Sequence, residues 1–396
     1  MSDNRWILPD GVQETLPPDA LAVELLRRRL LQTFDSWGYD MVMPPMIEYL
    51  DSLLTGTAHS LERLTFSLVD QISGKQMGVR SDMTPQVARI DAHMLADREQ
   101  QNRITRLCYC GHLLHTRGPG LTSSRTPLQI GAEIFGSTSI DADIEVARLM
   151  LEMMDVVGLP DVSIDIGHVG VFRSLIELSG LDEIHENRLF DMLQRKSIPD
   201  LQAYLAELPL TDKLRDQICQ LALMNGDVSI LDEAKARFSG LSEKMDRSLA
   251  TIRSVVDSLA NSFPELQIHC DLSELRGYSY HTGLVFAAFL PGQGKEIARG
   301  GRYDDVGKVF GNARPATGFS ADLLELYQLS SKQPLDRIAI LAPQSQGFEL
   351  QNKIASLRNE GFRVVIDLSA GELSAEAQSC QKILIRSSGA WGIEEV

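Results

Sequence analysis

The chain of 396 residues is 43% hydrophobic and 23% charged, which is typical of globular proteins and enough for two or more domains. Its 38 basic and 54 acidic residues give a net charge of −16, which disfavours non-specific binding to nucleic acid or to an anionic membrane. No apolar run approaches the roughly 18 residues of a membrane-spanning helix, and residues 1–10 lack the layout of a signal peptide. We therefore expect a cytoplasmic protein without membrane or nucleic-acid partners.

The cysteines do not resemble a disulfide framework, because the five thiols are odd in number and widely spread. Cys108 and Cys110 form the only close pair, and His112 and His115 follow them, so a metal site is one alternative. The alternating pattern around them predicts a strand, in which thiols pack as small apolar groups. No CxxC pair or second ligand cluster accompanies them, and we expect neither a metal nor another cofactor.

The first part of the chain predicts helices and strands in mixed order. Apolar residues at helical spacing from residue 19 predict a helix that Gly38 ends, followed by a strand over 39–43. Residues 64–70 and 75–80 predict a hairpin, and Thr84-Pro85 opens a helix that reaches residue 94. The further expected elements are strands at 104–114 and 127–135, a helix at 141–157 and a strand at 162–166.

The second part contains a helical insertion and a short tail. Residues 169–260 have an almost purely helical pattern, which we interpret as an insertion. Strands are expected at 266–272, 278–290 and 295–301, and a helix at 319–329. Residues 331–334 have a linker composition, and the tail 335–396 begins strand, helix, strand. Mostly antiparallel strands with segregated helices predict an α+β main domain over 1–330 and a short α/β domain over 335–396.

Four polar segments, which follow one another in consistent order, resemble the catalytic domain of class II aminoacyl-tRNA synthetases of the histidyl-tRNA synthetase kind. Residues 38–45 are similar to the dimer-forming motif 1, and Arg80-Ser-Asp-Met-Thr84 stands where the synthetases have Arg-Pro-Glu-Gly-Thr. Residues 111–136 align with motif 2, while 276–283 and 300–304 resemble the two histidine-recognition segments. The resemblance covers about residues 8–330 and implies an antiparallel sheet flanked by helices, while generic nucleotide motifs such as GxxxxGK[ST] are absent.

Two departures from the synthetase pattern argue against activation of an amino acid by ATP. Synthetase arginines bind the ATP phosphates, because a guanidinium is always charged and can bind phosphate in a bidentate manner. His115 occupies the motif 2 arginine position, and Glu325 occupies the motif 3 arginine position. A carboxylate beside a triphosphate replaces attraction by repulsion. The Coulomb energy is about 4 kcal/mol for each pair of unit charges 4 Å apart at an effective dielectric of 20. We therefore expect a lost ATP site and no aminoacylation.

The resemblance implies that the histidine pocket is largely kept. Asp82 stands where a carboxylate binds the α-ammonium group, with Thr84 beside it, and Gln129 stands where an amide contacts the amino-acid backbone. Glu133 matches the residue that accepts a hydrogen bond from the imidazole N–H. Arg276 matches an arginine near the ligand carboxylate, and His281 replaces a tyrosine that contacts the ring. The implied pocket also includes Arg125, Tyr280 and Tyr303.

Each of these residues also has an ordinary structural alternative. Gln129 and Glu133 are compatible with a polar pair in the core, and Asp82 with the cap of a helix that begins near Thr84. The Arg-Gly-Gly-Arg run at 299–302 is compatible with a tight turn, and His115 with a strand histidine that has no role. Their joint order and spacing favour the ligand-binding interpretation.

A synthetase-like chain that keeps a histidine pocket but lacks the ATP arginines resembles the regulatory subunits of ATP phosphoribosyltransferase, in the histidine biosynthetic pathway. A synthetase carries a longer anticodon-binding domain, whereas residues 335–396 form a shorter tail with 6 basic and 8 acidic residues, which we interpret as truncated. The resemblance implies a non-catalytic subunit that pairs with a short catalytic subunit in a hetero-octamer, forms a homodimer through motif 1 and responds to L-histidine. A divergent histidyl-tRNA synthetase, another histidine-binding paralogue and an RNA-binding module are the alternatives, and a subunit interface is the alternative histidine site.

Overall fold

The chain separates into two units, Met1–Lys332 and Gln333–Val396, which are described one at a time. The computed structural model describes residues 6–54, 59–95, 103–118, 124–275, 277–278, 280–306, 314–331, 338–345, 347–369, 371–387 and 389–396. Every structural statement below concerns these residues.

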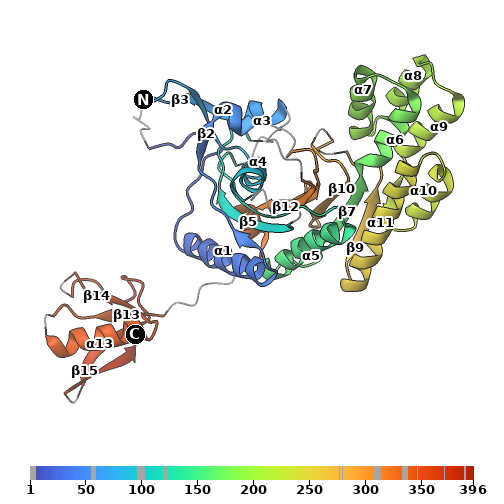
Figure 1. The fold of residues 1–396 in the computed structure, drawn as a ribbon. Helices are drawn as coiled ribbons and strands as arrows, with labels where there is room; N and C mark the ends of the chain where they lie inside the picture. Colours follow the sequence, from blue (N-terminus) through green and yellow to red (C-terminus); the bar gives the residue numbers. More distant parts are fainter. Residues whose placement is uncertain are drawn as a thin grey trace. The chain divides into compact units, whose positions relative to one another are not determined.

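A nine-stranded sheet lies at the centre of the larger unit, with the strand order β1-β5-β6-β12-β11-β10-β7-β9-β8 (Figure 1). Most neighbouring strands are antiparallel, as expected, while β1–β5 and β7–β9 are parallel. The strands are β1 (Asp40–Met41), β5 (Thr105–His112), β6 (Leu128–Phe135), β7 (Ser163–His168), β8 (Asn225–Asp227), β9 (Gln267–Asp271), β10 (Leu284–Phe289), β11 (Ala298–Arg302) and β12 (Ala316–Asp322). This order places the motif 2 strand, β6, directly beside the motif 3 strand, β12.

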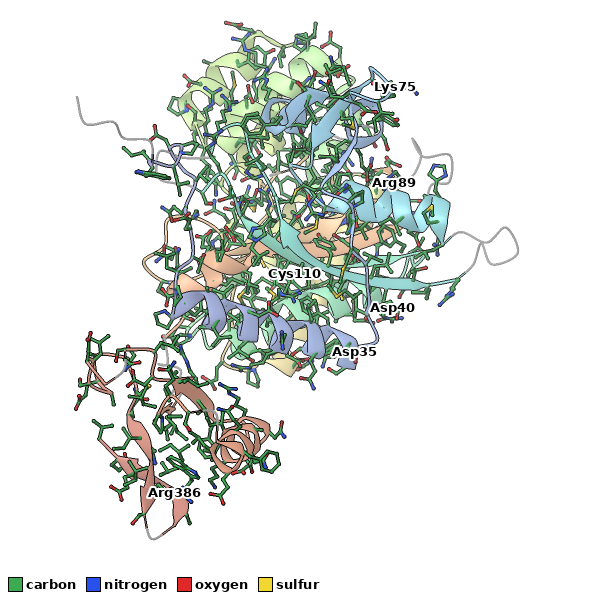
Figure 2. The ribbon with its side chains drawn as sticks, turned by 90° about the vertical axis from the view of Figure 1, so that its left-hand side faces the viewer. Asp35, Asp40, Lys75, Arg89, Cys110 and Arg386 are labelled. Atoms are coloured by element: carbon green, nitrogen blue, oxygen red, sulfur yellow. The ribbon has the colours of Figure 1, made fainter. Side chains whose placement is uncertain are left out.

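Two long helices, α1 (Asp19–Ser36) and α5 (Ile140–Val157), pack together against the large sheet (Figure 1). The buried side chains of α1 recur every three or four residues, so they form one apolar stripe. Phe34 of this stripe meets Phe319 of β12 edge-to-face, with ring centroids 6.0 Å apart. Asp35 and Asp40, labelled in Figure 2, lie on either side of the turn that leads from α1 into β1.

A three-stranded sheet of order β2-β4-β3 contains the expected hairpin. Its strands and the adjoining helices are β2 (Ile47–Tyr49), α2 (Leu50–Leu54), α3 (His59–Leu64), β3 (Phe66–Val69) and β4 (Gln76–Val79). The helix that follows, α4 (Thr84–Arg89), continues as a π-helix over Ile90–Met94. Glu48 of β2 forms a salt bridge of 2.5 Å with Arg89 of α4, which is labelled in Figure 2. The small sheet is therefore tied to the helix that begins at Thr84.

The expected insertion consists of six helices that gather at one end of the large sheet (Figure 1). They are α6 (Val169–Ser179), α7 (Glu183–Gln194), α8 (Ile198–Glu207), α9 (Asp212–Leu221), α10 (Ile230–Phe238) and α11 (Glu243–Ser262). The purely helical expectation is wrong in one place, because β8 lies within this segment and pairs with β9. Three residues are too short to produce a readable alternation of apolar and polar side chains.

The expected helix over 319–329 is also wrong in its first part. Residues up to Asp322 belong to strand β12, and only α12 (Leu323–Leu329) is helical. β12 is buried on both faces for most of its length, so it lacks the alternation that distinguishes a half-buried strand from a helix. The Asp322 side chain caps α12 by accepting a hydrogen bond of 3.0 Å from the Leu324 amide.

The expected strand over 278–290 begins later than expected. Of the described residues in this range, only those of β10, from Leu284, are extended, and the amides of Tyr280 and His281 are hydrogen-bonded to Gly277 in a turn. By contrast, the tight-turn alternative for residues 299–302 is wrong, because these residues lie within strand β11.

The smaller unit contains a four-stranded sheet of order β14-β13-β15-β16 and one helix (Figure 1). Its elements are β13 (Ala339–Ala342), α13 (Phe348–Asn359), β14 (Arg363–Ile366), β15 (Lys382–Ser387) and β16 (Ala390–Glu395). Ile340, Ile354 and Leu384 belong to the buried cluster between the helix and the sheet. β16 was not expected, because its side chains are mostly exposed and it pairs as an edge strand.

Candidate functional site

A buried carboxyl group surrounded by hydroxyls forms the centre of the site. Glu133 in β6 is 1% exposed, and its Oε1 accepts hydrogen bonds from Tyr109 at 2.9 Å and from Thr84 at 3.2 Å. Its Oε2 accepts a hydrogen bond of 2.5 Å from the hydroxyl of Tyr303. Burial raises the pKa of Glu133 to about 8 even though these hydrogen bonds oppose the rise. The centre of the cluster is thus a carboxyl group whose described contacts are hydroxyls rather than cations.

Two glycines leave the space that the Glu133 carboxyl group and the Tyr109 hydroxyl occupy. Gly318 of β12 lies opposite Glu133, and a Cβ atom built on Gly318 would lie 1.4 Å from Oε2 of Glu133. Gly131 lies opposite Tyr109, whose hydroxyl oxygen would be 2.5 Å from a Cβ atom at Gly131. The close approach of these side chains to the neighbouring backbone therefore requires glycine at both positions.

Asp82 and Gln129 form a second polar pair within the same region. Gln129 donates from Nε2 to Oδ1 of Asp82 at 2.9 Å and accepts from the Met83 amide at 2.9 Å. The same Asp82 oxygen accepts from the Thr84 amide at 2.9 Å, so Asp82 does cap the start of α4. The cap and the ligand role are compatible, since among the described residues the second carboxylate oxygen accepts no hydrogen bond.

Tyr280 and His281 approach the cluster from the turn that precedes β10. The Tyr280 ring stacks on Tyr303 with centroids 5.0 Å apart, and His281 meets Tyr280 edge-to-face at 5.4 Å. The Tyr280 hydroxyl is buried and has no hydrogen-bond partner among the described residues, so it is a free polar group beside the pocket. Burial lowers the pKa of His281 to about 4, so this ring is neutral at pH 7.

Arg125, one of the two arginines expected in the pocket, makes its described contacts away from Glu133. Arg125 donates to the carbonyl oxygens of His115, at 3.0 Å, and Asp10, at 3.2 Å, and its guanidinium lies 5.6 Å from the ring centroid of Phe66. Arg276 lies outside the described residues. The six expected pocket residues that the structure brings together are Asp82, Thr84, Gln129, Glu133, Tyr280 and Tyr303, and His281 adjoins them.

The two positions that carry phosphate-binding arginines in the synthetases have other contacts here. His115 lies just beyond β5, and its Nε2 faces the carbonyl oxygen of Ser81 at 2.8 Å. Glu325 lies in the first turn of α12, where Lys295 forms a salt bridge of 2.8 Å with it. The ammonium group of Lys295 is thus paired with Glu325, and the position of the synthetase arginine carries no free positive charge for a phosphate.

Tyr109 and Gly318 belong to the site as well, although the sequence predicts no role for either. Tyr109 lies in the strand expected over 104–114, and a glycine in the neighbouring strand, Gly131, is a signal that a large side chain lies against it. Gly318 lies seven residues before Glu325, in strand β12. The contact between Gly318 and Glu133 depends on the register of two strands that are distant in sequence.

The Cys108 thiol is buried, and the Cys110 thiol is half-buried. Burial raises the pKa of both thiols to about 12, which disfavours the thiolate form that binds metals. Within the described ranges, no three His, Cys, Asp or Glu side chains are arranged to hold a metal ion. None of the helices in the same part of the chain is long and apolar enough to span a membrane.

Comparison with known proteins agrees with this geometry. The profile of the histidyl-tRNA synthetase family matches residues 11–326, and that of the ATP phosphoribosyltransferase subunit HisZ C-terminal domain matches residues 337–394. A solved structure described as an ATP phosphoribosyltransferase regulatory subunit/histidyl-tRNA synthetase from Bacillus halodurans superposes with a TM-score of 0.83 at 25% identity. It covers 96% of this chain and 97% of that chain.

Two relatives match nearly the full chain, and both are named ATP phosphoribosyltransferase regulatory subunit. The protein from Thioalkalivibrio sulfidiphilus is 49% identical over 387 residues, covering 97% of each chain. The protein from Alkalilimnicola ehrlichii is 47% identical over 389 residues, covering 98% of this chain and 96% of its own. This chain therefore belongs to the family of ATP phosphoribosyltransferase regulatory subunits.

Proposed function

We propose that this chain is a non-catalytic subunit that an ATP phosphoribosyltransferase catalytic subunit requires for activity and for feedback control by L-histidine. The reaction is the first step of histidine biosynthesis. The observation that carries this proposal is the Glu133 cluster, in which a buried carboxyl group accepts hydrogen bonds from three hydroxyl groups. The positions of the ATP-binding arginines hold His115 and the lysine-paired Glu325 instead.

The pocket is chemically suited to a histidine ligand. Asp82 has a carboxylate oxygen available for the α-ammonium group, and Gln129 lies beside it. The hydroxyl groups around Glu133 carry no positive charge, whereas the imidazolium of a bound histidine would. This charge would lower the pKa of the Glu133 carboxyl group. The unpartnered hydroxyl of Tyr280 offers one further hydrogen bond.

Feedback control needs a difference in histidine affinity between two states of the assembly. Histidine inhibits only if it binds the inhibited arrangement of subunits more tightly than the active one. The Glu133 cluster connects β6, β12 and the turn before β10, so a ligand bound there would alter how these elements pack. We propose that this difference is passed to the catalytic subunit within a hetero-octamer.

The decisive experiment mixes the purified chain with a short catalytic subunit and measures formation of phosphoribosyl-ATP from ATP and phosphoribosyl pyrophosphate. We expect the catalytic subunit to gain activity on mixing and to lose it again when L-histidine is added. Failure to raise activity would contradict the proposal. Histidine-dependent exchange of pyrophosphate into ATP by this chain alone would instead favour the synthetase alternative, against which Glu325 argues.

We also propose that the chain forms a homodimer through the motif 1 region. Large apolar side chains are exposed in and around β1 and β2, and the hairpin β3–β4 exposes others. These residues are Met41, Met43, Met46, Ile47, Tyr49, Leu68, Val69 and Ile72. An exposed apolar patch of this kind marks a protein–protein interface more often than it does an ordinary surface.

Replacing Met43 by aspartate is expected to shift the chain from dimer to monomer, because the charge would be desolvated in the interface. Met43 is 80% exposed, so the monomer should fold normally. We expect the dimer dissociation constant, measured by analytical ultracentrifugation, to rise more than about tenfold. Ile184→Asp on α7, at a residue that is 75% exposed, is the matched control and should remain dimeric. A Met43→Asp variant that dimerises as tightly as this control would exclude the motif 1 interface.

A further inference from the structure

We propose that Tyr278 couples the helical insertion to the histidine pocket, so that ligand binding and the position of helices α6 and α7 depend on each other. The inference rests on the proposed histidine pocket and names the route by which its occupancy reaches the surface. Tyr278 is a positioning residue, because its contacts are with the insertion and not with the Glu133 cluster.

The first step is a tight turn that joins Tyr278 to the two aromatic residues beside the pocket. The amides of Tyr280 and His281 both donate to the carbonyl oxygen of Gly277 at 2.8 Å. Gly277 has a φ of 70°, and a Cβ atom there would lie 2.7 Å from the His281 ring. Two backbone hydrogen bonds therefore tie Tyr280 and His281 to Gly277, the residue directly before Tyr278, and this is the contact through which a shift of Tyr280 would reach Tyr278.

The second step is the attachment of Tyr278 to the insertion. Its ring packs against Phe172 of α6 and Phe190 of α7, with centroid distances of 5.3 and 5.4 Å. The Arg173 guanidinium lies 4.7 Å from the ring centroid and donates to the Tyr278 carbonyl oxygen at 2.9 Å. The Tyr278 hydroxyl donates to the carboxylate of Glu186 on α7. One side chain therefore holds both helices.

The third step runs from Tyr280 to the centre of the pocket. Tyr280 stacks on Tyr303, and Tyr303 donates to Glu133. A ligand that takes the place of the Tyr303 hydroxyl at Glu133 would displace Tyr303, and the ring of Tyr280 stacks on Tyr303. The turn transmits that movement to Tyr278 and hence to α6 and α7.

A second contact joins the insertion to the residues just before this turn. Lys196, which follows α7, forms a salt bridge of 2.6 Å with Asp271 at the end of β9. Lys196 has a φ of 49°, an uncommon conformation for a residue other than glycine. Asp271 in turn accepts hydrogen bonds from the amide and hydroxyl of Ser273, at 2.9 and 2.7 Å. The turn is thus tied to α7 at Tyr278 and, through β9, at Asp271.

The test uses Tyr278→Phe in the full-length chain, which removes the hydroxyl bond to Glu186 and keeps the ring contacts. In the wild type, saturating L-histidine should change amide hydrogen exchange across α7. In the variant this change should be lost. The dissociation constant for histidine should rise about fivefold, because the variant loses one hydrogen bond to a charged group and only part of its free energy favours the ligand-bound state. Glu186→Gln keeps an acceptor oxygen for the Tyr278 hydroxyl, so this variant should retain most of the coupling. Glu186→Ala should behave like Tyr278→Phe.

Tyr327→Phe is the matched control, because its hydroxyl donates to Asp19 at 2.8 Å, outside the turn and the insertion. It should leave both measurements unchanged. A wild-type α7 response in Tyr278→Phe would overturn the coupling. If the wild type does not bind histidine, the pocket proposal fails, and the coupling is tested without ligand. Tyr278→Phe must then accelerate amide hydrogen exchange at residues 280–283. Unchanged exchange at these residues would overturn the coupling.

Discussion

Replacing Glu133 by alanine is expected to weaken feedback inhibition strongly while the catalytic partner is still activated. The variant removes the buried carboxyl group that is proposed to accept the hydrogen bond from the imidazole. A hydrogen bond to a charged group contributes about 1.5–3 kcal/mol, so the histidine concentration that gives half inhibition should rise by roughly 10- to 100-fold. The measurement is a histidine inhibition curve of the mixed subunits, together with calorimetric titration of histidine into this chain.

Glu152→Ala provides the control for this substitution. Glu152 lies on α5, and its carboxylate accepts a hydrogen bond of 3.1 Å from the Trp37 indole, away from the pocket. The control should keep the wild-type inhibition curve. If Glu133→Ala does so too, the effector site is not the synthetase-like pocket, and an interface between subunits becomes the favoured location.

Replacing Gly318 by alanine is expected to damage the same pocket by steric overlap. The new methyl group would lie 1.4 Å from Oε2 of Glu133 and 2.7 Å from the carbonyl oxygen of Ala132, so side chain and backbone must both move. Overpacking of this kind costs about 1–3 kcal/mol of the free energy of unfolding. We expect a lower midpoint of urea unfolding and a loss of histidine binding comparable with that of Glu133→Ala.

A double-mutant cycle separates the overlap with Glu133 from a general disturbance of β12. In the Glu133→Ala background the carboxyl group is gone, so Gly318→Ala should cost clearly less than it does in the wild type. Gly226→Ala is the control for adding a methyl group in a strand, since its nearest neighbour, Ile230 Cβ, lies 3.9 Å away. Strict additivity of the Glu133 and Gly318 substitutions would show that the two positions do not interact.

Helices and strands in which apolar residues recur at a regular spacing could be predicted from the sequence, and those without such a spacing could not. Helices α1 and α5 have one apolar face each, and their positions are confirmed within a residue or two. β12 has no polar face, and β8 is too short for a pattern, so local periodicity carries no information about either. Such strands are determined by pairing with neighbours that are remote in sequence.

The candidate site shows the same division between local and remote information. The resemblance to the synthetases named Thr84, Gln129 and Glu133, which lie together, but their roles as ligand contacts stay predictions. Tyr109 and Gly318 escaped notice because each contacts Glu133 across a strand boundary whose register the sequence does not state. Asp82 was assigned two alternative roles, and its cap contact leaves the other role possible.

The lengths of the outermost strands of the large sheet limit how this protein can associate. β1 at one edge has two residues and is followed by Pro44 and Pro45, which cannot donate to a further strand. β8 at the other edge has three residues and is supplied by the insertion. Such short edge strands offer few free backbone groups to another chain, so they protect against edge-to-edge aggregation. We therefore expect another subunit to contact this sheet through side chains rather than by extending it.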